Sequence, residues 1–570
     1  MRNRAQKKGL TVQVIAGTHA VLIGIDVDDL TAFRGLGFAI RRTDHDEDEQ
    51  YWLRGMKVFP SVVPHPAPGQ NYALNRHPIQ GFQWGDYTAK PGHRYTYRVA
   101  VVEGTVTAPT LGTQVDVEVS TEKEDDGVHG VWFNRGVAAS QAWNTKFGAP
   151  ATELADPRSS AWAWLSRGLA EAFISTVDSA ADSSWALRGA FYEFTWKEGL
   201  RAFARAANER NVDVKLVVHG RDRDPDGATD DDDTTARASR IAATHAGVSP
   251  LVTWRTAPNK SSLQHNKFLV VLHNGIPTAV WTGSTNLTEG ALFGHSNVGH
   301  LVHDPVIAAA FLAYWNELHS DSETADLRDW TESENPLLPH RPTAIFSPRN
   351  TSSTLLDDYA SLFDRAESSA HLTGAFGINQ VFRAKLAVAK DYPRTVLLDK
   401  EPARDKRIAR GDDNVRIVWG ARLTSQLDQW AAERLTGFNP HVPYVHLKVM
   451  LVDPLTDTPA LLTGSANYSD ASTSSNDENT LALTVDETSP ATTADALTRV
   501  SDIYLTEYNR IFTHHVFRAF SKPGAAGPDS KGNRSLREDS SWVEPYQTGW
   551  RAVQRELFAG TRRSDDDATG

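Results

Sequence analysis

The chain has 570 residues, a length that exceeds one compact core and favours roughly two to four domains. Hydrophobic residues (40%) and charged residues (23%) occur in proportions ordinary for a globular protein, and the net charge of −12 gives no general attraction for phosphate backbones. That charge argues against a non-specific nucleic-acid binder and against a permanently membrane-bound protein. The absence of cysteine excludes disulfides, cysteine-ligated zinc and a thiol nucleophile.

Residues 1–120 show the alternation of short strands, punctuated by Pro and Gly clusters, and predict an all-β sandwich. The strands are expected at 10–15, 20–26, 37–42, 95–103 and 113–119. The stretch 87–99 resembles the late hairpin of a fibronectin type III sandwich, and another kind of β-sandwich is the alternative.

The apolar run at 12–25 is interpreted as strands rather than as a signal peptide. Polar residues and a glycine interrupt it, and it runs directly into Asp26 without a small-residue cleavage site. No run approaches the ~20 apolar residues that a membrane-spanning helix needs. We therefore expect a cytoplasmic protein without a transmembrane segment.

From about residue 121 the pattern changes to helices alternating with short apolar strands, and it does so twice. The first α/β half is predicted at 121–340, with helices at 169–177 and 198–210 and strands at 214–218 and 268–272. The second half is predicted at 341–522, with strands at 371–376, 394–398 and 415–419 and a helix at 496–511. Residues 523–570 form a C-terminal extension whose end beyond about 560 is predicted to be disordered. Trp542, Tyr546 and Trp550 are its candidate anchors to the body.

A five-residue pattern occurs once in each half at a constant offset. His446 lies 446 − 265 = 181 positions after His265, and the same offset relates the other four pairs. These pairs are Lys267 and Lys448, Gly283 and Gly464, Ser284 and Ser465, and Asn286 and Asn467. Recurrence at one offset, within matching strand–turn–strand contexts, indicates a duplication.

The repeated residue types suit chemistry at phosphorus. In an extended strand, residues i and i+2 face the same side, so each half presents an imidazole beside an ammonium. Lys and Asn suit the non-bridging oxygens of a phosphoryl group. Two such strands related by a pseudo-twofold axis would place His265 and His446 on opposite sides of one phosphorus, as in-line displacement requires. Ser284 and Ser465 either bind phosphate oxygens or close their own turns.

The motif His-x-Lys-x4-Asp followed by Gly-Ser-x-Asn resembles the signature of the phospholipase D superfamily. The second copy fits in full, with Asp453 as its aspartate, and the resemblance covers roughly residues 125–520. The motifs Trp-Thr-Gly-Ser-Thr-Asn at 281–286 and Asn-Asp-Glu-Asn at 476–479 resemble those of bacterial phospholipase D-like proteins. The resemblance implies a pseudo-symmetric body of mixed sheets flanked by helices.

It also implies a metal-independent mechanism without cofactor. One histidine attacks phosphorus to form a phosphohistidine. The other protonates the leaving alcohol and then activates water. No His-Glu-x-x-His or similar ligand cluster suggests a competing metal site.

The two halves differ at two positions. Leu272 stands where the second half has Asp453, an aspartate that the resemblance assigns to fold support. Glu478 lies eleven residues after Asn467, whereas Asn297 lies eleven after Asn286. We expect Asn297 to hold His265 neutral, as nucleophile, and Glu478 to support His446 as general acid and then base. Tyrosyl-DNA phosphodiesterases look similar in this respect.

Several neighbours have two interpretations. Trp281, Tyr468 and Phe293 either shape the substrate mouth or pack in the core, and packing is favoured. His295 and His300 are expected to be surface or structural residues. Glu193 is a candidate for the pocket, and Arg349 either contacts phosphate or forms a turn-stabilising salt bridge.

The sequence thus predicts a phosphodiester hydrolase, a monomer with its site formed within one chain. Phospholipid head-group release is favoured. A nuclease or nucleic-acid end-processing enzyme is the main alternative, and a phosphatidyltransferase a third. A binding module that retains the fold without turnover is the alternative of another class.

Overall fold

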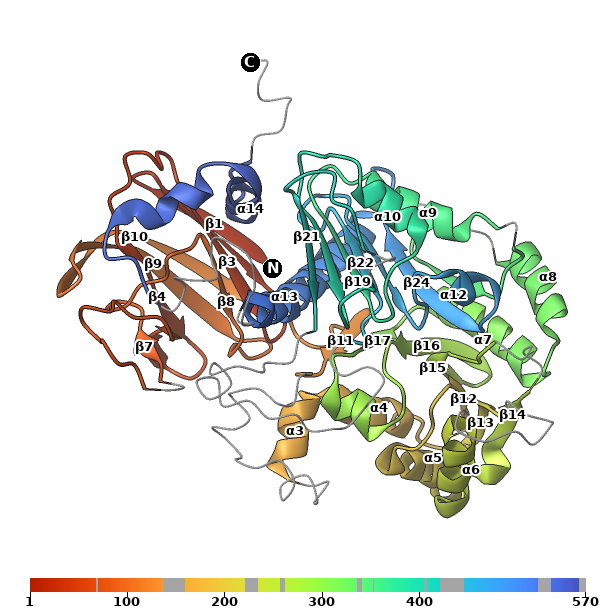
Figure 1. The fold of residues 1–570 in the computed structure, drawn as a ribbon. Coiled ribbons are helices and arrows are strands. Elements are labelled where there is room, and N and C mark those ends of the chain that lie inside the picture. Colours follow the sequence, from red (N-terminus) through yellow and green to blue (C-terminus); the bar gives the residue numbers. More distant parts are fainter. Residues whose placement is uncertain are drawn as a thin grey trace.

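The computed structural model describes residues 1–67, 70–136, 159–220, 234–256, 262–335, 341–351, 353–403, 407–420, 445–520 and 535–562. An N-terminal β unit lies beside a larger body that contains both α/β halves (Figure 1). The start of the predicted C-terminal extension, up to residue 534, and its predicted disordered end beyond 562 lie outside the described residues.

The N-terminal unit consists of two four-stranded antiparallel sheets and a short ribbon. One sheet has the order β1 (Arg2–Lys7), β2 (Leu10–Ala16), β3 (Val21–Val27), β8 (Gln83–Asp86). The other has the order β10 (Ala108–Ser120), β9 (Arg94–Thr105), β4 (Gly37–Asp44), β5 (Glu49–Trp52), and the ribbon joins β6 (Arg54–Gly55) to β7 (Tyr72–Ala73). Alternate residues of β9, including Tyr95, Tyr97 and Val99, enter one buried cluster with residues from both sheets, as period-two patterning requires. The predicted sandwich strands are confirmed; the finer likeness to fibronectin type III stays a prediction.

The body contains two seven-stranded mixed sheets with one topology. The first has the order β11 (His129–Phe133), β17 (Val298–Val302), β16 (Ile276–Gly283), β15 (Lys267–His273), β12 (Trp185–Phe191), β13 (Asp213–His219), β14 (Val252–Arg255). The second has the order β18 (Thr343–Ser347), β24 (Glu478–Thr484), β23 (Ala460–Gly464), β22 (Val449–Val452), β19 (Ala370–Gly374), β20 (Arg394–Leu398), β21 (Val415–Trp419). Parallel and antiparallel pairings occur at the same places in both sheets, so the duplication extends to the whole topology.

Two helices that follow the last strand of each half form the core between the sheets. They are α7 (Pro305–His319) and α13 (Ala491–Phe520), whose side chains share one buried cluster with those of β15 and β22. Helix α7 begins where its sequence dictates, because the Asp304 carboxylate accepts from the backbone N–H of Val306 and Ile307 and Pro305 occupies the first turn.

The remaining helices cover the outer faces of the sheets and the turns. In the first half these are α3 (Ser160–Ser166), α4 (Leu169–Asp178), α5 (Lys197–Glu209), α6 (Thr234–His245), η1 (Ser249–Leu251) and η2 (Gly290–Gly294). They are followed by α8 (Thr324–Glu334), α9 (Leu355–Asp364), α10 (Gln380–Leu386) and α12 (Asp470–Ser474). Among the described residues, no helix is both long and apolar enough to cross a membrane.

The described part of the C-terminal extension packs on the N-terminal unit, as Figure 1 shows for α14 (Gly549–Ala559). Trp542, in η4 (Ser540–Tyr546), is buried in the sandwich core, and its indole N–H donates to the carbonyl of Gly35 at 3.0 Å. Trp550 instead lies under Arg416 of β21, 5.0 Å from guanidinium carbon to ring centroid. The extension therefore joins the β unit to the second half.

Candidate active site

The two repeated His-Lys pairs lie at the start of β15 and just before β22. All four side chains are buried, with between 1% and 6% of their surface exposed. Each lysine turns back on its own histidine, since Lys448 Nζ donates to the backbone oxygen of His446 at 2.8 Å and Lys267 Nζ donates to that of His265. The i, i+2 spacing has thus produced the same local geometry twice.

Reciprocal backbone contacts connect the two halves at this point. The N–H of His265 donates to the carbonyl of Asp477 at 2.9 Å, and the N–H of His446 donates to the carbonyl of Ser296 at 3.1 Å. Each histidine is therefore joined to the residue just before the carboxylate or amide of the other half.

The electrostatics show that the two pairs form one site. Burial lowers the pKa of His446 well below its usual value, and Lys448, His295, Lys267 and His265 lower it further. Burial also lowers the pKa of His265 to about 4, against the opposing charge of Glu478. Because groups of each half act on the histidine of the other, both imidazoles lie in one low-dielectric region.

The partners of the two histidines are exchanged relative to the sequence-based expectation. His265 Nδ1 lies 2.8 Å from Glu478 Oε2, whereas His446 Nδ1 lies 3.0 Å from Asn297 Oδ1 and 3.1 Å from the carbonyl oxygen of Ser284. The predicted pairs, His265 with Asn297 and His446 with Glu478, are wrong. The reason is that a partner counted along one half's own chain faces the opposite half once the parallel bridges between Gln264 and Asp477 and between Ser296 and Val445 form.

The carboxylate of Glu478 is completely buried but well supplied with donors. Ser472 Oγ donates to its second oxygen at 2.7 Å, and Asn476 Nδ2 donates to the same oxygen at 3.2 Å. Burial opposes ionisation, yet the charges of His265 and Lys267 and the hydrogen bonds from His265 and Ser472 hold the pKa of Glu478 below its usual value. Glu478 is therefore an ionised partner for the His265 ring.

Neutral groups hold the Asn297 side chain in place, as Ser472 and Asn476 hold Glu478. Its Nδ2 donates to the carbonyl of Ala291 at 2.9 Å and lies 2.9 Å from His295 Nδ1, while its backbone N–H donates to Asn134 Oδ1 at 3.0 Å. These contacts fix the amide so that its oxygen faces His446. His295 is buried, with its ring 5.2 Å from that of His446, so it is a structural residue of this network rather than a surface one.

The two Gly-Ser-x-Asn turns approach the neighbouring strand closely. A Cβ at Gly283 would lie 2.3 Å from the Val298 carbonyl oxygen, and one at Gly464 would lie 2.4 Å from that of Asn479. Ser284 Oγ and Ser465 Oγ accept from the backbone N–H of Val298 at 3.1 Å and of Asn479 at 3.0 Å. Both serines thus close their own turns.

The asparagines of these turns retain unused acceptors. The side-chain oxygens of Asn286 and Asn467 are buried without a hydrogen-bond partner among the described residues, and Asn286 Nδ2 donates to Glu193. Burial lowers the pKa of Lys267 to about 7, opposed by Glu478 and Glu193. Burial, with the charge of Lys267, lowers the pKa of Lys448 well below its usual value. Burial thus disfavours the charged form of both lysines, and a bound anion would stabilise that form.

Comparison with known proteins agrees with this construction. Residues 173–319 match the family model described as cardiolipin synthase, PLD-like domain. This stretch of the first α/β half therefore contains a phospholipase D-like domain.

Solved structures similar to the chain include those of three differently named proteins. Phosphatidylserine synthase of Haemophilus influenzae is 12% identical over 60% of this chain and 84% of its own, with a TM-score of 0.42. Nuc from Salmonella typhimurium is 26% identical over 27% and 87%, with a TM-score of 0.20. Yeast tyrosyl-DNA phosphodiesterase is 13% identical over 54% and 85%, with a TM-score of 0.30. A search of curated proteins gave no match.

The aspartate of the phospholipase D motif clamps a turn. Asp453 accepts from the backbone N–H of Glu367, Ser368 and Ser369 at 2.6–3.1 Å. Its first-half counterpart, Leu272, is buried in the core between the sheets. At this motif position, Asp453 thus stabilises a turn through hydrogen bonds in the second half, whereas Leu272 contributes apolar packing in the first.

The other candidates have structural surroundings. Trp281 stacks on Trp132, Phe293 packs edge-on against Trp162, and Tyr468 is buried. His300 lies between His129 and the Tyr504 hydroxyl, 3.0 Å from each. Arg349 is buried and donates to the carbonyls of Phe346, Thr331 and Asn335, so it holds backbone oxygens instead of a phosphate or an acidic side chain.

Two residues that sequence reasoning missed support the site from behind. Arg255 is fully buried and donates to Asp477 at 2.9 Å and to Asp321 at 3.1 Å, which fixes the segment before Glu478. Asn134 does the same for the segment before Asn297, because its amide donates to the carbonyls of Ala291, Leu292 and His295. Neither residue belongs to a repeated motif, so no sequence signal marked them.

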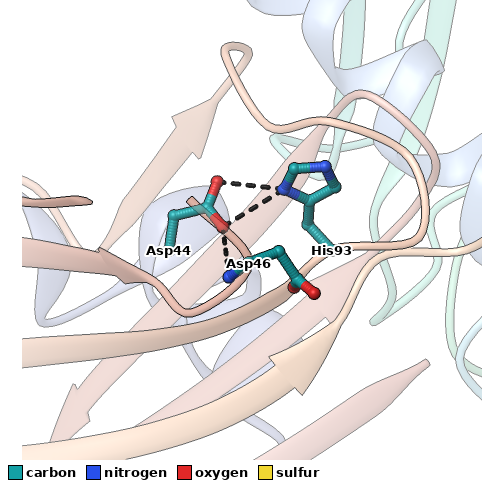
Figure 2. A group of neighbouring side chains, drawn as sticks. All are labelled: Asp44, Asp46 and His93. Carbon is teal, nitrogen blue, oxygen red and sulfur yellow. Dashed lines mark hydrogen bonds and ion pairs between the residues drawn. The ribbon is translucent and has the colours of Figure 1, made fainter. Parts of the chain in front are cut away.

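One group among the described residues has the spacing of a metal site, and it lies in the N-terminal unit. Figure 2 shows Asp44, Asp46 and His93 around the turn between β4 and β5. His93 Nδ1 lies 3.1 Å from both oxygens of Asp44, and Asp46 accepts from the backbone N–H of Arg94 at 2.6 Å. These hydrogen bonds stabilise the turn and explain why the three side chains lie together.

Proposed function

We propose that this protein is a metal-independent phosphodiester hydrolase that forms a phosphohistidine on His265, and that phospholipid is its substrate. The observation that carries the proposal is the reciprocal pairing across the halves, which brings His265 with Glu478 and His446 with Asn297 to one buried cationic site. Both histidines come from the same chain, which favours a monomer as the active unit.

The order of the two histidines follows from charge. Attack by His265 Nε2 forms the N–P bond and places a positive charge on the ring, which the buried Glu478 carboxylate stabilises through Nδ1. His446 Nδ1 faces two neutral oxygens and burial depresses the pKa of this ring, so the ring is neutral before substrate binds. The bound phosphate anion raises this pKa, the ring takes up a proton from solvent at Nε2, and it gives that proton to the leaving oxygen as the P–O bond breaks. His265 therefore remains the proposed nucleophile, but for a different reason. The expectation assigned the role to the histidine with a neutral amide partner, whereas here the carboxylate that stabilises the charged, phosphorylated ring assigns it.

The second step restores the enzyme. His446 takes a proton from water, the resulting oxygen attacks phosphorus, and the N–P bond breaks to return a neutral His265 ring. Lys267, Lys448 and the amides of Asn286 and Asn467 bind the non-bridging oxygens throughout. Anion binding raises the depressed pKa values of both lysines, so the substrate itself keeps them charged.

The test is to trap and locate the covalent adduct. His446→Asn should accumulate phosphoenzyme from bis(4-nitrophenyl) phosphate because the second step lacks its base, and peptide mapping should place the phosphoryl group on His265. His265→Asn should form none. A chelator should leave wild-type turnover unchanged. An adduct on His446 would refute the order of the histidines, and absence of turnover on phospholipid, DNA, RNA and the generic diester would refute the enzyme.

A further inference from the structure

The two halves place different residues at equivalent points beside the site. In the first half Phe191 pairs with Lys267, and in the second half Leu372 pairs with Met450. Continuing that antiparallel register sets Gly374 opposite Lys448. Two residues further along each chain stand Glu193 and Phe376, so these are structural counterparts.

The equivalence extends past these residues. The N–H of Trp196 donates to the carbonyl of Leu287 at 2.7 Å, and the N–H of Asn379 donates to that of Tyr468 at 3.3 Å. Leu287 follows Asn286 as Tyr468 follows Asn467. Glu193 and Phe376 therefore hold equivalent positions in the two halves, between the strand that pairs beside the motif lysine and the backbone contact with the residue after the motif asparagine.

The first-half position is anionic. Glu193 accepts from the Asn286 amide, and its charge opposes the effect of burial on the pKa of both Lys267 and Lys448. Tyr192 beside it lies with its ring 5.0 Å from that of His265. A carboxylate this near the phosphate-binding groups repels a second phosphate and attracts an ammonium or a hydroxyl.

The second-half position is apolar. Phe376 has 58% of its surface exposed, and of the phenylalanines whose exposure the structure describes it is the one that is exposed. Phe376 lies in a turn between Gly374 and Gly377. A hydrogen bond from the N–H of Gly377 to the carbonyl of Gly374, 3.3 Å long, closes this turn. An exposed ring at the position equivalent to that of Glu193 offers a contact to an apolar part of the substrate.

We propose that Glu193 and Phe376 read the two ester groups of the substrate, an inference that rests on the proposed phosphodiesterase function. The substrate class is a phospholipid whose amino or hydroxyl head group lies against Glu193 and whose acyl chains lie against Phe376. A polynucleotide fits less well. One of its neighbouring phosphates would face Glu193, although a base could stack on Phe376.

The experiment uses the full chain and monomeric short-chain lipids. Glu193→Gln should lower the ratio of kcat/KM for dihexanoyl phosphatidylethanolamine to that for dihexanoyl phosphatidylmethanol about tenfold, the value of one charge-assisted contact. Phe376→Ala should lower the ratio of kcat/KM for dihexanoyl lipid to kcat/KM for dibutanoyl lipid about fivefold. Glu209→Gln, at the exposed end of α5, and Val388→Ala, another exposed apolar residue of the second half, are matched controls that should leave both ratios unchanged.

Comparing ratios separates the two levels of the proposal. If both ratios match those of the controls while bis(4-nitrophenyl) phosphate and phospholipid are still hydrolysed, the specificity inference is wrong and the function stands. If a single-stranded oligonucleotide is the best substrate and Phe376→Ala slows its cleavage, the inference is overturned in favour of nucleic acid. If no phosphodiester is hydrolysed, the function fails and the inference fails with it.

Discussion

Replacing Glu478 by glutamine tests the crossed pairing directly. Glutamine has the shape of the native side chain and retains an oxygen for the hydrogen bond from His265 Nδ1, so the substitution removes mainly the negative charge. Its amide nitrogen also takes the place of an oxygen that accepts from Ser472 and Asn476 or from His265. The positive charge that the ring gains when the N–P bond forms then lacks its buried counter-ion.

The magnitude follows from the geometry. The hydrogen-bonded atoms are 2.8 Å apart and both side chains are buried. Two unit charges centred about 4 Å apart interact by about 4 kcal/mol at an effective dielectric constant of about 20. A retained neutral hydrogen bond restores about 1 kcal/mol of this. The net loss of about 3 kcal/mol predicts a first chemical step about 150-fold slower.

Quenched-flow kinetics with bis(4-nitrophenyl) phosphate measures that step. Because nitrophenolate leaves without a proton, its burst reports formation of the adduct, and the slower phase reports hydrolysis of the adduct. Glu478→Gln should slow the burst. Asn297→Ala, the matched change at His446, should leave the burst rate within a few-fold of wild type and slow the second phase. A normal burst in Glu478→Gln, or a lost burst in Asn297→Ala, would refute the assigned partners and roles.

Four further results are expected. First, kcat/KM for bis(4-nitrophenyl) phosphate, whose leaving group needs no proton from His446, should fall below about pH 4, as His265 is protonated, and above about pH 7, as Lys267 loses its proton; a flat profile from pH 7 to 9 would contradict this. Second, Lys267→Met should abolish activity yet raise the free energy of unfolding at pH 6 by up to about 5 kcal/mol. The depressed pKa of Lys267 in the native state destabilises the folded protein fully below about pH 7 and progressively less toward pH 10.5. The stability gained by Lys267→Met in urea unfolding should therefore shrink across that range, and a gain independent of pH would contradict the depressed pKa. Third, Asp453→Asn should lower the free energy of unfolding by about 2 kcal/mol in urea with kcat/KM changed less than tenfold; a larger kinetic loss at full stability would show a direct role. Fourth, Trp542→Ala should lower the free energy of unfolding by about 3 kcal/mol, and limited proteolysis should cut the C-terminal extension before it cuts the body. Unchanged digestion would show that the Trp542 indole does not anchor the extension.

The sequence predicted most of what depends on local order. The offset that relates His265 to His446 indicated a duplication, and the two sheets share one strand order from end to end. The i, i+2 spacing placed each lysine with its histidine, because alternation along an extended chain is fixed by backbone geometry alone. The same local rules located the N-terminal strands.

What the sequence left undetermined depends on contacts between distant segments. Glu478 was recognised as a partner but assigned to the wrong histidine, since only the bridge between Gln264 and Asp477 shows which half it faces. Arg255 and Asn134 stayed hidden for the same reason: their role lies in holding a segment more than 100 positions away. A spacing rule identifies only residues that are close along the chain. Which residues of one half face the histidine of the other half depends on how the two sheets pack on α7 and α13 and bury their apolar surfaces.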